Sequence, residues 1–215
     1  MSYPILYSFK RCPYAMRARM ALQLAEIKCE IREIRLSNKP EHMLEISPKG
    51  TVPILILEDK IIDESYDIVN WVIEKRNIFN ENLRSDQINL TESLIKKFDE
   101  AFKHHLDRYK YATRYENADS EFHRSECLKI LIDLEAIASN GKWIFGENLN
   151  KLDISILPFI RQFRIANPGW FDSLEEISRI KKILNNYLNS EEFKKIMFKY
   201  DEWQLGSKPV YFPST

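Results

Sequence analysis

The chain has 215 residues, of which 44% are hydrophobic and 30% charged, so it can build a sizeable core and is not expected to be disordered. Its 32 basic and 32 acidic residues leave a formal net charge of zero. General binding to nucleic acid or to an acidic membrane surface requires a basic excess, so we expect neither partner. The sequence also lacks an apolar run of about 18 residues that would predict a transmembrane helix.

The cysteine content favours a reducing compartment. Three cysteines, Cys12, Cys29 and Cys127, are too few and too scattered for a disulfide framework. The first five residues lack the basic and apolar regions of a signal peptide. Together these features predict a cytoplasmic protein.

Residues 1–77 alternate between strand and helix patterns. Strands are expected over 5–9, 30–34, 51–57 and 60–62, and helices over 13–26 and 65–75, with a weaker helical pattern within 37–47. The resulting order, β-α-β-α-β-β-α, predicts a small mixed sheet with helices around it.

The remainder of the chain reads as helical. Residues 78–87 are polar and are interpreted as an interdomain linker. Helical spacing of apolar residues then extends over 88–111, 122–139, 152–165 and 175–188, with a short helix expected within 191–200. We therefore predict an α/β domain over 1–77 and an all-α domain over 88–215.

Cys12 stands between the first strand and the first helix, and Pro13 follows it. Proline is favoured at the first position of a helix, which places Cys12 at the N-cap, facing the positive end of the helix dipole. Lys10, Arg11 and Arg17 add positive charge nearby. These effects favour the thiolate and hence a reactive cysteine. The alternative is a small buried cysteine that only packs.

Pro53 precedes a run of apolar residues, Ile54–Leu57, which reads as a strand. A trans proline would disturb pairing there, whereas a cis proline in a tight turn would not. A trans proline at the edge of a loop is the alternative.

The chain resembles the cytosolic glutathione transferase superfamily, and most of all its cysteine-type branches, the omega class and the bacterial glutaredoxin-2-like proteins. The resemblance covers essentially the whole chain and rests on a set of short motifs: Cys12-Pro13-Tyr14-Ala15, Asn38-Lys39-Pro40-Glu41, Val52-Pro53, Glu64-Ser65 and Asp153. It implies a thioredoxin-like N-terminal domain that binds glutathione as a cosubstrate, followed by a helical domain that lines the site for a small apolar, disulfide or electrophilic second substrate. It also implies a homodimer.

The resemblance implies specific roles at the reacting thiol. Cys12 would form a mixed disulfide with glutathione, and Val52, which precedes the family's cis-proline (here Pro53), would pair its backbone with the cysteinyl part of glutathione. Dithiol oxidoreductases carry a second cysteine three residues on, where this chain has Ala15. A second glutathione would therefore have to resolve the mixed disulfide.

Further roles are implied for the ends of glutathione. Glu64 and Ser65 would hold the γ-glutamyl end at a helix N-terminus, and Lys39 would reach the glycine carboxylate. Tyr14 would line the pocket. Taken alone, a pair such as Glu64-Ser65 is far more often a helix cap than a ligand site, and Lys39 would be a solvated lysine.

Two rival functions stay open. Tyr7 or Ser8 lies where a hydroxyl activates glutathione for conjugation to electrophiles in other branches of the superfamily. Alternatively, the chain is a non-catalytic ligand carrier or an RNA polymerase-associated stress protein. Such members tend to lose the catalytic residue or the glutathione-binding set, and this chain keeps both.

The remaining motifs are interpreted as structural. Asn150 and Asp153 would make a capping box at the start of a buried helix, and Cys29 and Cys127 would be packing residues. His104 and His105 are adjacent, so we expect them to point to different sides of a helix. With His42 and His123 they are read as surface or packing residues, and no metal is predicted.

Overall fold

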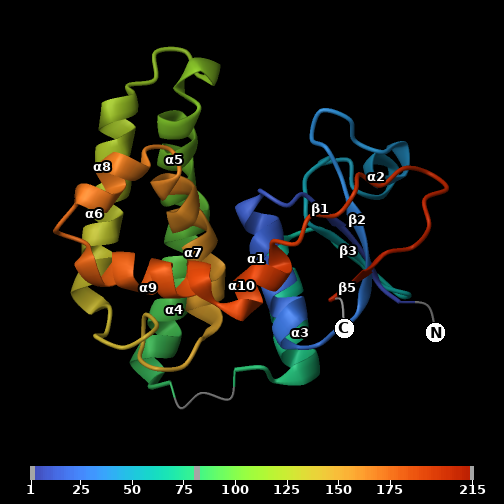
Figure 1. The fold of residues 1–215 in the computed structure, drawn as a ribbon, viewed down its shortest axis with the longest axis horizontal. Helices are drawn as coiled ribbons and strands as arrows, with labels where there is room; N and C mark the ends of the chain where they lie inside the picture. Colours follow the sequence, from blue (N-terminus) through green and yellow to red (C-terminus); the bar gives the residue numbers. More distant parts are fainter. Residues whose placement is uncertain (1–2, 80–82, 214–215) are drawn as a thin grey trace. The chain divides into compact units, whose positions relative to one another are not determined.

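A computed structural model describes residues 3–79 and 83–213, and Figure 1 shows its ribbon. The chain divides into two compact units. Unit 1 comprises Met1–Asn80 and Ser190–Thr215, and unit 2 comprises Glu81–Asn189. None of the helices in the described ranges has the length and apolar character needed to span a bilayer.

Unit 1 is built on a mixed sheet. Its five strands are β1 (Ile5–Ser8), β2 (Cys29–Glu33), β3 (Ile54–Ile56), β4 (Ile61–Ile62) and β5 (Tyr211–Phe212). They lie in the order β4-β3-β1-β2-β5, with β1 parallel to β2 and the other pairs antiparallel. This arrangement confirms the predicted thioredoxin-like fold class.

The described residues of unit 1 also form four helices. They are α1 (Pro13–Leu24), α2 (Glu41–Ile46), α3 (Ser65–Arg76) and α10 (Glu191–Ile196). Helices α1 and α3 run side by side, and α10 packs against α1 (Figure 1). Because α1 has neighbours on several sides, all of its residues from Ala15 to Leu22 are buried, including the charged Arg17 and Arg19.

Successive side chains of β1 point to opposite faces of the sheet. Ser8 contacts Arg19 of α1, whereas Tyr7 contacts His42 of α2 and packs in a cluster with Met43. The hydroxyls of Tyr7 and Ser8 therefore lie on different faces.

The regular elements in the described residues of unit 2 are all helical. Its elements are α4 (Ser85–Lys97), a π-helical turn η1 (Phe98–Phe102), α5 (Lys103–Lys110), a 3-10 turn η2 (Ala112–Arg114), α6 (Ser120–Ile137), α7 (Lys151–Arg164), α8 (Pro168–Ser173) and α9 (Ser178–Asn189). Helix α7 is buried over most of its length. This confirms the predicted helical character of the region.

The structure corrects the predicted domain boundaries. Residues 190–215, which we expected in the all-α domain, belong to unit 1, where α10 packs on α1 and β5 pairs with β2. The predicted linker, 78–87, is shorter at its end because α4 already begins at Ser85. Part of this linker, 80–82, lies outside the described residues.

Candidate functional site

Cys12 occupies the N-cap of α1, with extended backbone angles and Pro13 at the first helical position, as predicted. Its thiol is half-buried and donates a hydrogen bond to the carbonyl oxygen of Val52, with Sγ 3.5 Å from that oxygen. The start of a helix carries backbone N–H groups without intrahelical partners and the positive end of the dipole. The Cys12 sulfur therefore lies where a negative charge is favoured.

The Val52-Pro53 peptide bond is cis, as predicted. Both residues are buried, and the Val52 carbonyl faces Cys12 across the turn before β3. The structure thus brings together two segments, forty residues apart, that the sequence motifs assigned to the same ligand.

Ser65 is the first residue of α3 and is almost fully buried. Its hydroxyl accepts a hydrogen bond from Nε of Arg17, at 2.9 Å. Arg17 also lies over the ring of Tyr14, 5.2 Å from its centroid. This buried arginine therefore links the start of α3 to the Cys12 end of α1, a role that the sequence analysis missed because it treated Arg17 only as nearby charge.

Glu64 is exposed and, among the described residues, its side chain makes no capping hydrogen bond to α3. Instead its carboxylate accepts from Nζ of Lys49 at 2.7 Å, and Lys49 also reaches Asp63 at 3.2 Å. A hydrogen bond from the hydroxyl of Ser47 and the charge of Lys49 lower the pKa of Asp63. Lys49 was not predicted, and its only sequence signal is that it lies between Lys39 and Val52.

Lys39 is exposed, and its side chain passes close to Gly50, the residue before Thr51 and Val52. A Cβ built on Gly50 would meet Nζ of Lys39 at 3.3 Å, and the positive φ of Gly50, 59°, suits glycine. Lys39 therefore lies close to the Val52-Pro53 turn.

The Tyr7 hydroxyl is already engaged by neighbours. The tyrosine is fully buried, and its hydroxyl lies 2.8 Å from Nδ1 of His42 and accepts from Nη1 of Arg32 at 2.9 Å. Burial raises the pKa of Tyr7, although Arg32 opposes that effect. The guanidinium of Arg32 also stacks over Trp203, 4.4 Å from the ring centroid. Trp203 follows α10, so this cluster depends on the C-terminal part of unit 1.

Ser8 is also buried, and its hydroxyl accepts a hydrogen bond from Nη1 of Arg19. The same guanidinium donates to the carbonyl oxygen of Lys10 at 2.8 Å and lies near Glu33. Burial raises the pKa of Glu33. Arg19 therefore fixes the chain between β1 and α1, which holds the Cys12 turn in place.

The other cysteines differ from Cys12. Cys29 and Cys127 are fully buried, and burial raises the pKa of both thiols well above the usual range. The thiol of Cys127 donates to the carbonyl oxygen of Phe102 at 3.7 Å. Both environments suit packing residues.

In unit 2, Asn150 and Asp153 form the predicted capping box at the start of α7. The Asn150 side chain accepts from the backbone N–H groups of Leu152 and Asp153, and the fully buried Asp153 accepts from Asn150 and Ile144. Phe159 and Phe163 of the same helix are core residues.

The structure differs from one expectation for the histidines. His104 and His105 do not point to different sides of their helix, because their rings lie next to each other and next to that of His123. Their exposed or half-buried positions agree with the expected surface or packing residues.

Comparisons with known proteins agree with this geometry. The profile of the family "Glutathione S-transferase, N-terminal domain" matches residues 6–81. A "Probable glutathione S-transferase parA" from Nicotiana tabacum is 30% identical over 177 residues, which cover 80% of this chain and 74% of that protein.

Solved structures share the fold. One is a glutathione transferase family member from Pseudomonas fluorescens pf-5, crystallised with two glutathione bound. It matches with a TM-score of 0.79 at 16% identity, and the match covers 91% of this chain and 92% of that chain. Glutathione transferase Omega 3C from Trametes versicolor has a TM-score of 0.77 at 19% identity, with 94% and 92% covered.

Proposed function

The chain belongs to the glutathione S-transferase family, and we propose that within this family it acts through the thiol of Cys12, as a cysteine-type thiol transferase. It is a glutathione transferase enzyme, and glutathione is its cosubstrate. The proposal rests above all on the position of Cys12, whose half-buried thiol lies at the start of α1 and contacts the Val52 carbonyl.

The proposed reaction is two successive thiol–disulfide exchanges. The Cys12 thiolate attacks the glutathione sulfur of a mixed disulfide, R–S–SG, so that a Cys12–SG bond forms and RS⁻ leaves. The thiolate of a second glutathione then attacks Cys12–SG, which releases oxidised glutathione and restores the Cys12 thiolate. The incoming glutathione thiolate is the reductant: its sulfur ends in oxidised glutathione, joined to the –SG group that came from R–S–SG, and the released RS⁻ takes up the proton that this glutathione thiol lost.

We favour the Cys12 thiol over a hydroxyl that activates glutathione, because the hydroxyls of Tyr7 and Ser8 already have hydrogen-bond partners. Tyr7 and Ser8 are both buried and hydrogen-bonded to arginines on different faces of the sheet. Activation of the glutathione thiol requires a hydroxyl that can reach that sulfur. This favours the thiol route over conjugation driven by Tyr7 or Ser8.

We propose that glutathione lies along the segments around Cys12. The Val52 backbone would pair with its cysteinyl part, beside the Cys12 sulfur, and Pro53 would hold that turn. Ser65, at the positive start of α3, would bind the γ-glutamyl carboxylate, and Glu64 its ammonium group. Glu64 pairs with Lys49 at the surface, and we expect this exposed pair to be exchanged for the ammonium group at little cost.

The remaining assignments concern the ends and the wall of the pocket. Lys39 would reach the glycine carboxylate, since its ammonium group lies close to Gly50, two residues before Val52. Tyr14, the second residue of α1, lies against the guanidinium of Arg17 and would line the pocket.

The test is a mass measurement combined with two assays. After treatment with oxidised glutathione, the intact chain should gain about 305 Da, one glutathione, confined to Cys12. Cys12→Ser should remove both the adduct and the reduction of a small glutathione mixed disulfide. Retained disulfide reduction in Cys12→Ser, or chloronitrobenzene conjugation that outpaces disulfide reduction and depends on Tyr7, would contradict the proposal.

A homodimer and a cytoplasmic location remain proposals. The first is implied by the superfamily, and the second is supported by the low cysteine content. Sedimentation velocity on the purified chain would test the first, since a dimer would sediment at twice the mass of 25.6 kDa.

A further inference from the structure

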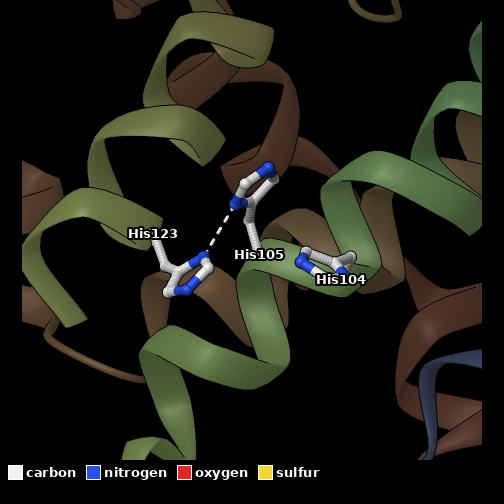
Figure 2. Close-up of side chains that lie close together, drawn as sticks. All are labelled: His104, His105 and His123. Atoms are coloured by element: carbon white, nitrogen blue, oxygen red, sulfur yellow. Dashed lines mark hydrogen bonds between the residues drawn. The ribbon is translucent and has the colours of Figure 1, made fainter. Parts of the chain in front are cut away.

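Three of the chain's four histidines lie in one cluster of unit 2. His104 and His105 belong to α5, and His123 belongs to the first turn of α6. Figure 2 shows the three imidazoles close together, with a hydrogen bond between His105 and His123. The two Nδ1 atoms of this pair are 2.8 Å apart, and one nitrogen atom of each histidine lies within 4.8 Å of those of the others.

The packing of two helices brings the cluster together. Neighbouring residues on a helix diverge, which led to the expectation that His104 and His105 lie apart. Their rings nevertheless meet edge to face with centroids 5.1 Å apart, and α6, which packs along α5, carries His123 to both of them. The site thus draws its donors from two helices that are already in contact.

The protonation of these rings suits metal ligation. An imidazole that accepts a hydrogen bond from another must be neutral at that nitrogen. Neutral imidazole is the form that binds metal ions.

Charged groups of both signs lie around the cluster. Nη1 of Arg108 lies 3.0 Å from Nδ1 of His104. The guanidinium of Arg108 also lies over the ring of Tyr115, 4.6 Å from the ring centroid. Asp119 and Glu126 contribute negative charge from α6 and its N-cap. Because Arg108 has the Tyr115 ring as a second partner, a cation can displace it from His104 without leaving the guanidinium unsupported.

We propose that His104, His105 and His123 bind one divalent transition-metal ion of the Zn²⁺ type. Three imidazoles with a fourth position open to water form a common set for Zn²⁺, and nitrogen donors also suit Ni²⁺ and Cu²⁺. Mg²⁺ and Ca²⁺ prefer oxygen ligands and are excluded by the same donors. The ion would replace the His105–His123 hydrogen bond and join α5 to α6.

The site is independent of the thiol chemistry, so it is tested in the Cys12→Ser chain, where a metal ion has no accessible thiolate to bind. Calorimetric titration with Zn²⁺ should show one ion per chain, and thermal unfolding should shift to higher temperature as Zn²⁺ is added. His105→Gln and His123→Gln should each weaken Zn²⁺ binding by at least about tenfold, since even loss of an outer contact to a ligand has an effect of that size.

The matched control is His42→Gln, which removes the one histidine outside the cluster. It should leave Zn²⁺ affinity within about twofold. An equal loss in His42→Gln, or unchanged affinity in both cluster variants, would overturn the proposal.

A second measurement needs no substitution in the cluster and so does not depend on how the variants fold. Zn²⁺ should shift the imidazole NMR signals of His104, His105 and His123 and leave those of His42 in place. Co²⁺ should give the intense visible absorption of a tetrahedral site. Absence of saturable Zn²⁺ binding, or shifts confined to His42, would show that the cluster is only a packing contact.

Discussion

Helix α1 in unit 1 and helix α7 in unit 2 begin in opposite ways. At α7, Asn150 and Asp153 exchange hydrogen bonds with the backbone, and both residues are buried. At α1, among the described residues, the N-cap Cys12 makes no capping hydrogen bond to the helix, and its thiol turns to Val52 instead. A satisfied helix start stabilises the fold, whereas a start without a side-chain cap keeps its positive end available to a thiolate or a ligand.

The largest effect is expected for Cys12→Ser. Serine is a good N-cap, so this variant should convert α1 into a capped helix like α7. Thiol transfer should fall by on the order of 10³-fold or more, because the nucleophile is lost. The free energy of unfolding should stay equal or rise by about 0.5–1 kcal/mol. Urea unfolding beside the disulfide-reduction assay measures both, and a marked loss of stability would show that the cysteine itself holds the turn.

Asp153→Ala tests the capped helix start of the comparison, that of α7. It removes the acceptor of two buried N–H groups, those of Asn150 and Ile144, and should lower the free energy of unfolding by about 2–5 kcal/mol. Asp153→Asn keeps one acceptor oxygen and should lose less. Glutathionylation of Cys12 should persist in whatever fraction stays folded, and a selective loss of that adduct would assign Asp153 to the site.

Ser65→Ala tests the start of helix α3, which, like that of α1, lacks a side-chain capping hydrogen bond. It should weaken glutathione binding by about tenfold, because it removes the buried hydroxyl that we propose binds the γ-glutamyl carboxylate. The matched control is Ser85→Ala, since Ser85 is the exposed first residue of α4. Equal effects of the two substitutions on a glutathione titration would remove Ser65 from the binding site.

The smallest change in activity is expected for Tyr7→Phe. The Tyr7 hydroxyl bonds to Arg32 and His42, so its loss should lower stability by about 1 kcal/mol and alter disulfide reduction by less than about twofold. A rate loss far larger than this, with unfolding unchanged, would revive the conjugation route.

Most of the correct predictions rest on local sequence signals. The Cys12-Pro13 helix start, the cis Val52-Pro53 bond and the capping box at Asn150 each depend on residues close in sequence, and the structure confirms all three. Helix α8 was missed because it is short and begins with Asn167-Pro168, a pair typical of a turn.

The missed features depend on packing between distant segments. No spacing within α5 reveals that α6 brings His123 to His105. Likewise Arg17 reads as surface charge until α3 places Ser65 beside its Nε. The helical pattern within 191–200 does not indicate which unit residues 190–215 join, and the structure shows β5 paired with β2.

The return of residues 190–215 to unit 1 affects how the chain can fold during synthesis. Unit 2 is inserted into unit 1, so the sheet has its edge strand β5, and Arg32 its stacking partner Trp203, only after all of unit 2 has emerged. Domains generally fold as units in order of synthesis. Here the helical unit can complete its folding first, and the thiol-bearing unit is closed last, by the final part of the chain.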